Sequence, residues 1–334
     1  MLIFTNKYIP VVINRVFSYL LSILVLVSCA GQGDRHADVP EWEPVTPDGL
    51  PARTVALDTM ELANPFVVYE RAANRYYMTG DGGYIWTSED LRMWTGPYNV
   101  LCTGKDVWYA GCEVSAPEIH RYEDRYCYMA SFEKQGGGCA SCEVLVADDI
   151  TGPYIPVNAG NVLLDSVVNA GHPTFCADEL NTGYMIYSDS AEPGGALKII
   201  RFTPDLSKKM GEPFTMLANV QGDGKQIKAP YLFVTDTGVP GLLFTVYEGE
   251  ESVISVAYTT NELGHWLNGP WITEPQPLIN GNVGGASLFT DYDGTLVMAI
   301  HKDTLIAGRN VRVPRFVKME SQFDKLKKIG YYNF

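Results

Sequence analysis

Basic residues are scarce in this sequence of 334 residues: 25 Lys and Arg stand against 39 Asp and Glu, a formal net charge of −14 at pH 7. Such a chain repels a phosphate backbone, which excludes nucleic acid as a partner. Hydrophobic residues make up 46% of the chain and charged residues only 19%, which excludes a disordered chain, and seven cysteines are too few for a disulfide scaffold. What remains is a globular protein with one large core or two modest ones.

The N-terminus has no acidic residue and carries an export signal. Lys7 and Arg15 precede an apolar stretch over residues 16–27, which is too short and wrongly flanked for a stable membrane span. The run Leu26-Val27-Ser28-Cys29 resembles a bacterial lipobox, in which the cysteine becomes the lipidated first residue; an ordinary cleaved signal is the alternative. We expect a signal peptide over residues 1–28, a tether over 29–50 and one folded domain over 51–334. A lipid anchor at Cys29 would place the protein in a bacterial cell envelope, in the periplasm or on the outer-membrane surface.

Six cysteines follow Cys29, an even number that permits disulfides in an exported chain. The spacing Cys139-Ala140-Ser141-Cys142 follows three glycines and has no second such pair elsewhere. A structural loop bridge is therefore the favoured interpretation, and a metal or redox pair is the alternative.

A short pattern recurs five times in the body of the chain. A small or polar residue, usually followed by Pro, precedes apolar residues at intervals of 52, 56, 57 and 56 residues. The copies are Asn64-Pro65-Phe66-Val67, Ala116-Pro117-Glu118-Ile119, His172-Pro173-Thr174-Phe175, Ala229-Pro230-Tyr231-Leu232 and Gly285-Ala286-Ser287-Leu288. Each is followed by a turn and a strand-like run rich in Tyr, Ile and Val, and no comparable series of amphipathic helices occurs.

Five units of several strands with a period near 55 residues predict an all-β fold, a five-bladed β-propeller. The first strand of each blade lines the central axis of a propeller, and a Pro at its start removes no ladder donor. The residues beside the prolines are therefore expected to crowd around the mouth of one funnel, where ligand chemistry is normally placed.

These units resemble glycoside hydrolase family 43, five-bladed propellers that act on arabinose-, xylose- and galactose-containing glycans. The resemblance covers about residues 55–316. It rests on the five motifs, the Ser88-Glu89-Asp90-Leu91 turn with Trp94, the Gly-Pro-aromatic turns and His301 near the end of a last-blade strand. It implies an oligosaccharide or polysaccharide partner.

The resemblance also implies three catalytic carboxylates, at the positions held here by Asn64, His172 and Lys228. None of the three is a carboxylate. Inverting hydrolysis needs one carboxylic acid and one carboxylate base, and Asn64 cannot accept a proton at neutral pH. His172 titrates in a useful range and is the member of the three able to act alone as acid or base. We expect the usual mechanism to fail.

Other side chains are candidates for the funnel mouth. Those able to supply a substitute carboxylate are Asp81, Glu113, Glu118, Asp189 and Glu248, each of which also reads as a solvated loop acid or turn cap. Aromatic residues that could stack on sugar faces or belong to the core are Tyr84, Trp86, Trp108, Tyr109 and Phe132. The predicted substrate-binding set is Trp86, Trp108, Glu113, Asp189 and His301.

His301 resembles a last-blade His that lies near a central metal or water in the family, and a buried His bonded to backbone is the alternative. The accompanying Gly-His-Gly element reads Gly284-Gly285-Ala286-Ser287 here. We therefore expect no metal or cofactor, with a central calcium ion as the alternative. Two functions stay open: a glycosidase with a rearranged catalytic set, and a carbohydrate-binding propeller that has lost hydrolysis. A scaffold that binds a protein partner is a third, weaker hypothesis.

Overall fold

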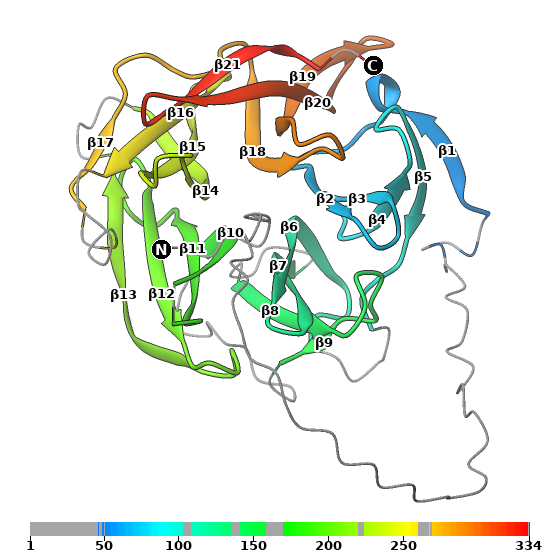
Figure 1. Cartoon of the computed structure of the whole chain (residues 1–334), viewed down its shortest axis with the longest axis horizontal. Coiled ribbons are helices and arrows are strands. Elements are labelled where there is room, and N and C mark those ends of the chain that lie inside the picture. The colour runs from blue at the N-terminus through cyan, green and yellow to red at the C-terminus, as the bar shows by residue number, and fades with distance from the viewer. Residues whose placement is uncertain are drawn as a thin grey trace, which may run out of the picture.

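Short apolar runs separated by turns fold into five antiparallel sheets arranged as a ring, the predicted five-bladed β-propeller (Figure 1). The computed structural model describes residues 51–102, 108–134, 141–157, 170–178, 180–219, 224–259 and 269–332, together with 46, 49, 267 and 334. The expected signal peptide and Cys29 lie outside the described residues. Within the described part of the chain, no helix is long and apolar enough to span a bilayer.

Each blade is built from strands that follow one another in the chain. Blade 1 contains β1 (Arg53–Ala56), β2 (Phe66–Glu70), β3 (Arg75–Thr79), β4 (Ile85–Ser88) and β5 (Met93–Tyr98). Blade 2 contains β6 (Cys112–Tyr122), β7 (Arg125–Lys134), β8 (Ser141–Ala147) and β9 (Ile155–Pro156). Blade 3 contains β10 (Ala170–Ala177), β11 (Gly183–Asp189), β12 (Ala196–Phe202) and β13 (Lys209–Ala218). Blade 4 contains β14 (Gln226–Val234), β15 (Pro240–Glu248), β16 (Glu251–Thr259) and β17 (Trp271–Thr273). Blade 5 contains β18 (Val283–Thr290), β19 (Leu296–Ile306), β20 (Arg309–Gln322) and β21 (Lys325–Tyr331). A short 3-10 helix, Leu57–Thr59, follows β1.

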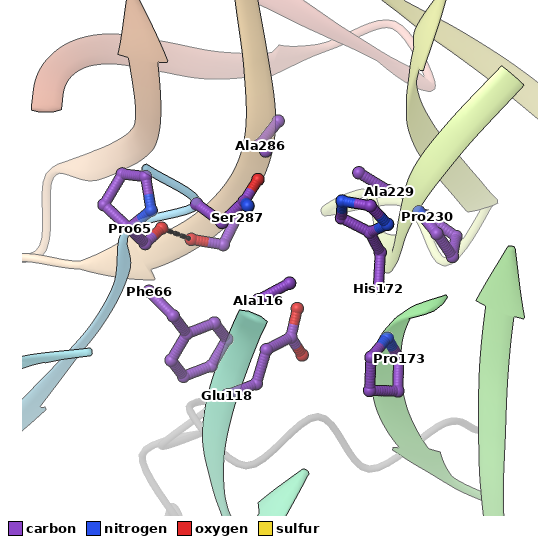
Figure 2. A pocket seen from close by; sticks show the side chains of 12 residues that line it. Pro65, Phe66, Ala116, Glu118, His172, Pro173, Ala229, Pro230, Ala286 and Ser287 are labelled. Carbon is purple, nitrogen blue, oxygen red and sulfur yellow. Dashed lines mark hydrogen bonds between the residues drawn. The ribbon is translucent and has the colours of Figure 1, made fainter. Parts of the chain in front are cut away.

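The first full-length strand of every blade lies innermost, as the repeat predicted, so that the five motifs meet around one cavity (Figure 2). The residue at the same place in each motif has a positive φ: 49° at Asn64, 47° at Ala116, 50° at His172, 53° at Ala229 and 61° at Gly285. In blades 2 to 5 this residue belongs to a β-bulge that shifts the register between the first and second strands. Because a non-glycine residue in this region costs about 1–2 kcal/mol, four blades hold the chain under local strain at the axis.

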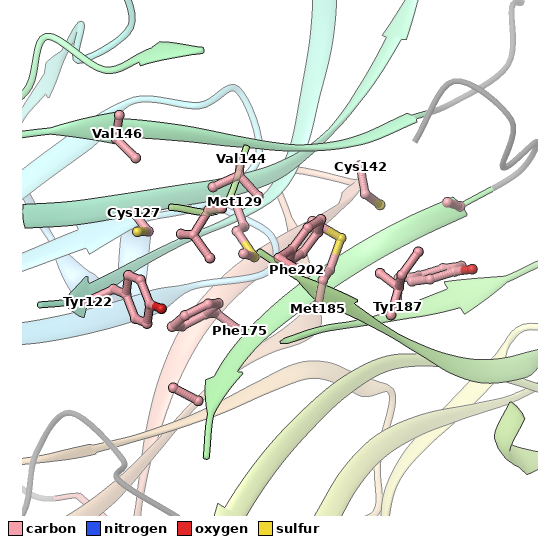
Figure 3. Packing of buried hydrophobic residues seen from close by; sticks show 14 residues of the cluster. Tyr122, Cys127, Met129, Cys142, Val144, Val146, Phe175, Met185, Tyr187 and Phe202 are labelled. Carbon is pink, nitrogen blue, oxygen red and sulfur yellow. The ribbon is translucent and has the colours of Figure 1, made fainter. Parts of the chain in front are cut away.

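The core is divided among five hydrophobic clusters, each formed between two neighbouring blades. Figure 3 shows the cluster between blades 2 and 3, where Met129 and Val144 face Phe175 and Met185. Both faces of a blade are therefore buried, which explains why β4 and β11 are buried along their whole length. Stability comes from contacts between blades, as expected for a repeat protein whose units cannot bury their apolar faces alone.

The ring closes where blade 5 packs on blade 1, without a strand shared between the two sheets. Their cluster joins Trp94 and Val67 to Phe289 and Phe316. Beside it, the fully buried Asp291 of blade 5 accepts hydrogen bonds from the hydroxyl groups of Tyr76 and Tyr332. Closure thus combines these side-chain contacts with a backbone hydrogen bond from Leu62 N to Arg312 O at 2.9 Å.

The predicted Cys139–Cys142 bridge is wrong as far as Cys142 is concerned. Cys142 is a free thiol, completely buried between blades 2 and 3, with its Sγ 3.8 Å from Ser131 Oγ. Burial raises the pKa of this thiol, so it behaves as a small apolar core residue. Cys139 lies outside the described residues.

Candidate functional site

A hollow of about 20 Å³, with room for a water-sized group, lies on the propeller axis and takes its walls from all five first-strand motifs. Its apolar lining comes from Pro65, Phe66, Ala116, Pro173, Ala229, Pro230 and Ala286. Its polar groups are Asn64, Glu118, His172 and Ser287 (Figure 2). Polar groups that converge around an apolar hollow are typical of a ligand site, although this hollow by itself holds only a water-sized group.

The mouth of this pocket is held by five hydrogen bonds between blades, which we call the axial ring. In each, the backbone N–H of the positive-φ residue donates to a side chain from the preceding blade. The bonds run from Asn64 N to His301 Nδ1 (3.1 Å), Ala116 N to Asp81 Oδ1 (2.9 Å), His172 N to Ser131 Oγ (2.8 Å), Ala229 N to Ser188 Oγ (2.9 Å) and Gly285 N to Thr245 Oγ1 (3.2 Å). Each satisfies a backbone donor that would otherwise be unpaired in a bulge, which costs about 1–3 kcal/mol when buried.

Sequence reasoning named two acceptors of the axial ring, Asp81 and His301, as candidates for the funnel mouth and missed the other three, although a signal was present. A polar residue follows each positive-φ residue by 15 to 17 positions: Asp81, Ser131, Ser188, Thr245 and His301. The repeat thus has a second element, which was not part of the first-strand pattern. Arg312 on β20 was also missed, because nothing in the sequence brings this last-blade residue to the pocket mouth.

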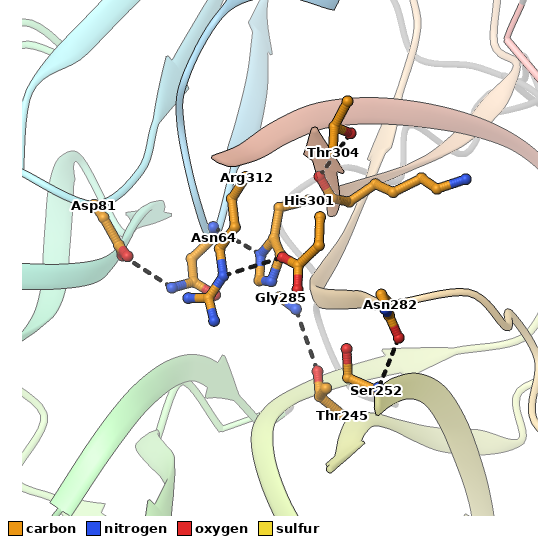
Figure 4. A network of polar contacts seen from close by, with 11 residues as sticks. Asn64, Asp81, Thr245, Ser252, Asn282, Gly285, His301, Thr304 and Arg312 are labelled. Carbon is orange, nitrogen blue, oxygen red and sulfur yellow. Dashed lines mark hydrogen bonds and ion pairs between the residues drawn. The ribbon is translucent and has the colours of Figure 1, made fainter. Parts of the chain in front are cut away.

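Asn64 and Asp81 form the polar contact at the blade 1 side of the mouth (Figure 4). Asn64 Nδ2 donates to Asp81 Oδ1 at 2.9 Å, and the same oxygen accepts the bond from Ala116 N. Asn64 is buried and Asp81 is partly exposed. The amide therefore acts as a donor here, and one oxygen of the carboxylate holds two hydrogen bonds.

His172 lines the opposite side of the pocket and is partly exposed to it. Burial lowers its pKa to about 4, and the positive charges of Lys228 and Arg312 act in the same direction, while Asp81 opposes them. The imidazole is therefore neutral at pH 7. Lys228 lies on β14 directly before Ala229, with its Nζ 6.0 Å from the centre of the Tyr247 ring. The structure thus brings all three predicted positions, Asn64, His172 and Lys228, to the same part of the axis.

Glu118 is the carboxyl group inside the pocket, two residues beyond Ala116 on β6. Its Oε2 lies 2.6 Å from His120 Nε2, and the His120 ring packs against Phe66 with centroids 4.8 Å apart. Burial raises the pKa of Glu118, although the contact with His120 opposes the shift. The protonated form of the Glu118 carboxyl group is therefore favoured over the carboxylate more strongly than it is in water.

None of the five predicted substrate-binding residues is among those that line the pocket. Trp86 is 5% exposed and packs in the cluster between blades 1 and 5. Asp189 is buried and pairs with Lys198 Nζ at 2.6 Å. Glu113 is exposed on β6, opposite Glu133 in the register. Trp108 is half-buried against Tyr109 and Phe132, so most of its ring belongs to the core between blades 1 and 2.

His301 is buried at the seam between blades 5 and 1, where its Nδ1 accepts the hydrogen bond from Asn64 N. Burial lowers its pKa to about 3, and the charge of Arg312 adds to the shift. A calcium ion takes six to eight oxygen ligands. The surroundings of His301 do not fit such an ion, because its Nδ1 already accepts a hydrogen bond and the positive charge of the Arg312 guanidinium lies close by. The described residues also contain no group of three His, Cys, Asp or Glu side chains placed to hold a metal.

The family follows from comparison of the whole chain. A family model described as glycosyl hydrolases family 43 matches residues 59–317, a span that contains all five first-strand motifs and the complete axial ring. The chain belongs to glycoside hydrolase family 43. No curated protein sequence matches it closely enough to count as a relative.

Solved structures of family 43 proteins have the same fold. The endo-arabinase from Bacteroides thetaiotaomicron VPI-5482 is 20% identical with a TM-score of 0.68, and the match covers 81% of this chain and 98% of that one. A thermostable family 43 glycoside hydrolase is 17% identical with a TM-score of 0.68, over 85% and 96% of the two chains. An endo-1,4-beta-xylanase from the same Bacteroides strain is 17% identical with a TM-score of 0.65, over 84% and 97%. At these identities the likeness establishes the fold.

Proposed function

We propose that this family 43 propeller recognises an arabinose-, xylose- or galactose-containing glycan in its axial pocket, without the inverting hydrolysis of its family. The proteins of similar structure are named for arabinan and xylan as substrates, which supports a plant-type glycan. The hollow itself admits only a water-sized group, so a sugar residue at the end or side of such a chain would lie across its mouth, beside Asn64 and His172.

The hydrogen bond between Asn64 and Asp81 carries this proposal. At the position where the family resemblance implies a catalytic base, the amide of Asn64 donates to a carboxylate and has no lone pair basic enough to take a proton from water. Lys228 stands where the resemblance implies the acid, and a neutral His172 stands at the third position. Loss of one general catalyst costs typically ~10²–10⁴ in rate, so loss of both leaves little catalysis.

A rearranged hydrolase is the second candidate, and two observations favour it. Asp81 lies beside Asn64 and is partly exposed, so it is placed to replace the missing base. Glu118 has the raised pKa that a general acid requires. Against it, Asp81 Oδ1 already accepts two hydrogen bonds and Glu118 is paired with His120.

One titration separates the two candidates. The purified full chain is titrated calorimetrically with arabinose-, xylose- and galactose-containing oligosaccharides, and the same mixtures are analysed for products. We expect binding without products. Products that disappear in both Asp81→Asn and Glu118→Gln would establish the rearranged hydrolase, and absence of binding to every oligosaccharide would refute glycan recognition.

Restoring the family carboxylates gives an independent check. Asn64→Asp alone would place two carboxylates about 3 Å apart, where like charges cannot both stay ionised. The restored set therefore combines Asn64→Asp, His172→Asp and Lys228→Glu with Asp81→Asn, which keeps a donor and an acceptor at position 81. A decayed hydrolase should gain activity in this variant, and a rearranged hydrolase should lose what it had.

We also propose that Cys29 carries a lipid that holds the propeller at a bacterial envelope membrane, through the tether of residues 29–50. The lipobox-like run and the acid-free N-terminus support this location. A glycan-recognising domain would then face saccharides outside the cytoplasm.

A further inference from the structure

Two cations with unused hydrogen-bond donors stand at the mouth of the axial pocket. Lys228 projects from β14 beside Ala229, and within the described part of the chain it forms no ion pair; its charged group has the Tyr247 ring as its neighbour. Arg312 on β20 lies beside Asn64 (Figure 4) and contacts Asp303 through Nε at 3.4 Å, with its side chain 45% exposed. Both act electrostatically on His172, and Arg312 also acts on Tyr247, so they share one neighbourhood.

The carboxylates of this neighbourhood are committed elsewhere. Asp81 Oδ1 accepts from Asn64 Nδ2 and Ala116 N, and Asp303 contacts the Nε edge of Arg312. The Lys228 ammonium and the terminal nitrogens of Arg312 have no described carboxylate partner, whereas the imidazole of His172 carries no charge at pH 7. The mouth therefore offers cationic donors that no described carboxylate occupies, in a chain whose net charge is −14. Its complement is a group that only accepts hydrogen bonds and carries negative charge.

We propose that the mouth of the axial pocket takes an anionic saccharide, whose carboxylate or sulfate group binds Lys228 and Arg312 while its ring lies across the mouth. This inference rests on the proposed function, because it names the class of glycan recognised at the same site. The guanidinium fork matches a carboxylate or sulfate through two parallel N–H bonds, and the lysine adds a compact charge. A neutral sugar would leave the Lys228 ammonium without an ion-pair partner among the described residues.

The test uses matched ligand pairs on the full chain. Calorimetric titrations compare a uronate-containing oligosaccharide with its methyl ester, and a sulfated oligosaccharide with its desulfated form. We expect one anionic member to bind at least tenfold more tightly than its neutral partner, and the better anion identifies the group recognised. Lys228→Gln and Arg312→Gln should each weaken that binding about 10- to 100-fold, the usual effect of losing a charge-assisted hydrogen bond, and should leave neutral ligands unaffected.

Lys225→Gln is the matched control. Lys225 lies three residues before Lys228, its substitution removes the same charge, and it already pairs with Glu248 at 3.4 Å. It should bind as the unaltered chain does, and a thermal melt confirms that each variant is folded. Equal binding of anionic and neutral members, or no effect of Lys228→Gln and Arg312→Gln, would overturn the inference while the proposed function stands. No binding of any ligand in either pair or in the neutral panel would overturn both.

Discussion

His301 makes the stability of the propeller depend on pH in a way that can be worked out from one hydrogen bond. Its Nδ1 must stay unprotonated to accept the bond from Asn64 N across the seam between blades 5 and 1. Burial and the nearby Arg312 lower its pKa from 6.5 to about 3. Between these two pH values the unfolded chain binds a proton that the folded chain does not, so stability falls as the pH falls.

The magnitude follows from linkage. Each pH unit below about 6.5 costs ~1.4 kcal/mol, so at pH 4.5 this one histidine removes about 2.7 kcal/mol of the free energy of unfolding. His172, with a pKa lowered to about 4, acts in the same direction, as does any carboxylate paired in the folded state. The contribution of His301 is therefore measured as the difference in free energy of unfolding between the unaltered chain and His301→Asn. In this variant the amide oxygen replaces Nδ1 as acceptor and does not titrate.

Denaturant unfolding at several pH values from 7.5 to 4.5 measures this difference. We expect the unaltered chain to lose stability more steeply than His301→Asn as the pH falls, with the two slopes differing by about one proton. Thr245→Val is the control, because it removes the acceptor of Gly285 N at the neighbouring seam. It should lower stability by about 1–3 kcal/mol at every pH. A difference between the unaltered chain and His301→Asn that does not change with pH would refute the reasoning, as would an NMR titration in which His301 gains its proton near pH 6.

Three further outcomes are expected. Gly285→Ala should lower the melting temperature more than Gly294→Ala does. Both glycines have a positive φ, but a Cβ at Gly285 would clash with Asn64 Oδ1, whereas a Cβ at Gly294 would have open space. Equal losses in the two variants would show that crowding at Gly285 is unimportant. Lys198→Met should lower the free energy of unfolding by about 3 kcal/mol, because it leaves the buried Asp189 without its ion-pair partner. Adding Asp189→Leu should recover part of the loss. A Lys198→Met variant as stable as the unaltered chain would contradict the buried pair. Cys29→Ala should abolish incorporation of labelled fatty acid and release the protein from the membrane fraction, whereas Cys102→Ala should do neither; labelling that persists in Cys29→Ala would exclude the anchor.

The sequence predicted the architecture because the repeat is periodic and local. Pro65, Pro117, Pro173 and Pro230 marked the first strands at intervals near 55 residues, and these strands do surround the axis. The period left one solution, since several strands per unit bury both faces only when the units are arranged in a ring.

The positions of single side chains were harder to predict, because the arrangement of the blades in a ring buries both faces of each sheet. A blade has neighbours on both faces, so a strand such as β4 is buried throughout and shows no alternation that separates its two sides. Trp86 could therefore be assigned to the funnel although it lies in the core between blades 1 and 5. Asp189 at the end of β11 was a candidate for sugar binding, but the hairpin to β12 brings Lys198 against it. Such pairings depend on register, which the pattern of residue types does not contain.

The axial ring explains how the backbone at the pocket mouth can stay the same when the side chains that line the pocket differ. Five different positions use three types of acceptor group, a carboxylate at Asp81, hydroxyl groups in three blades and an imidazole at His301, to bind one kind of N–H group. The fold requires only that an acceptor be there, so the side chains of the donor residues are free to vary. Asn64 shows both roles in one residue: its backbone N–H closes the ring, and its side-chain amide binds Asp81. An exchange at this side chain alters the chemistry of the pocket and leaves the closure intact.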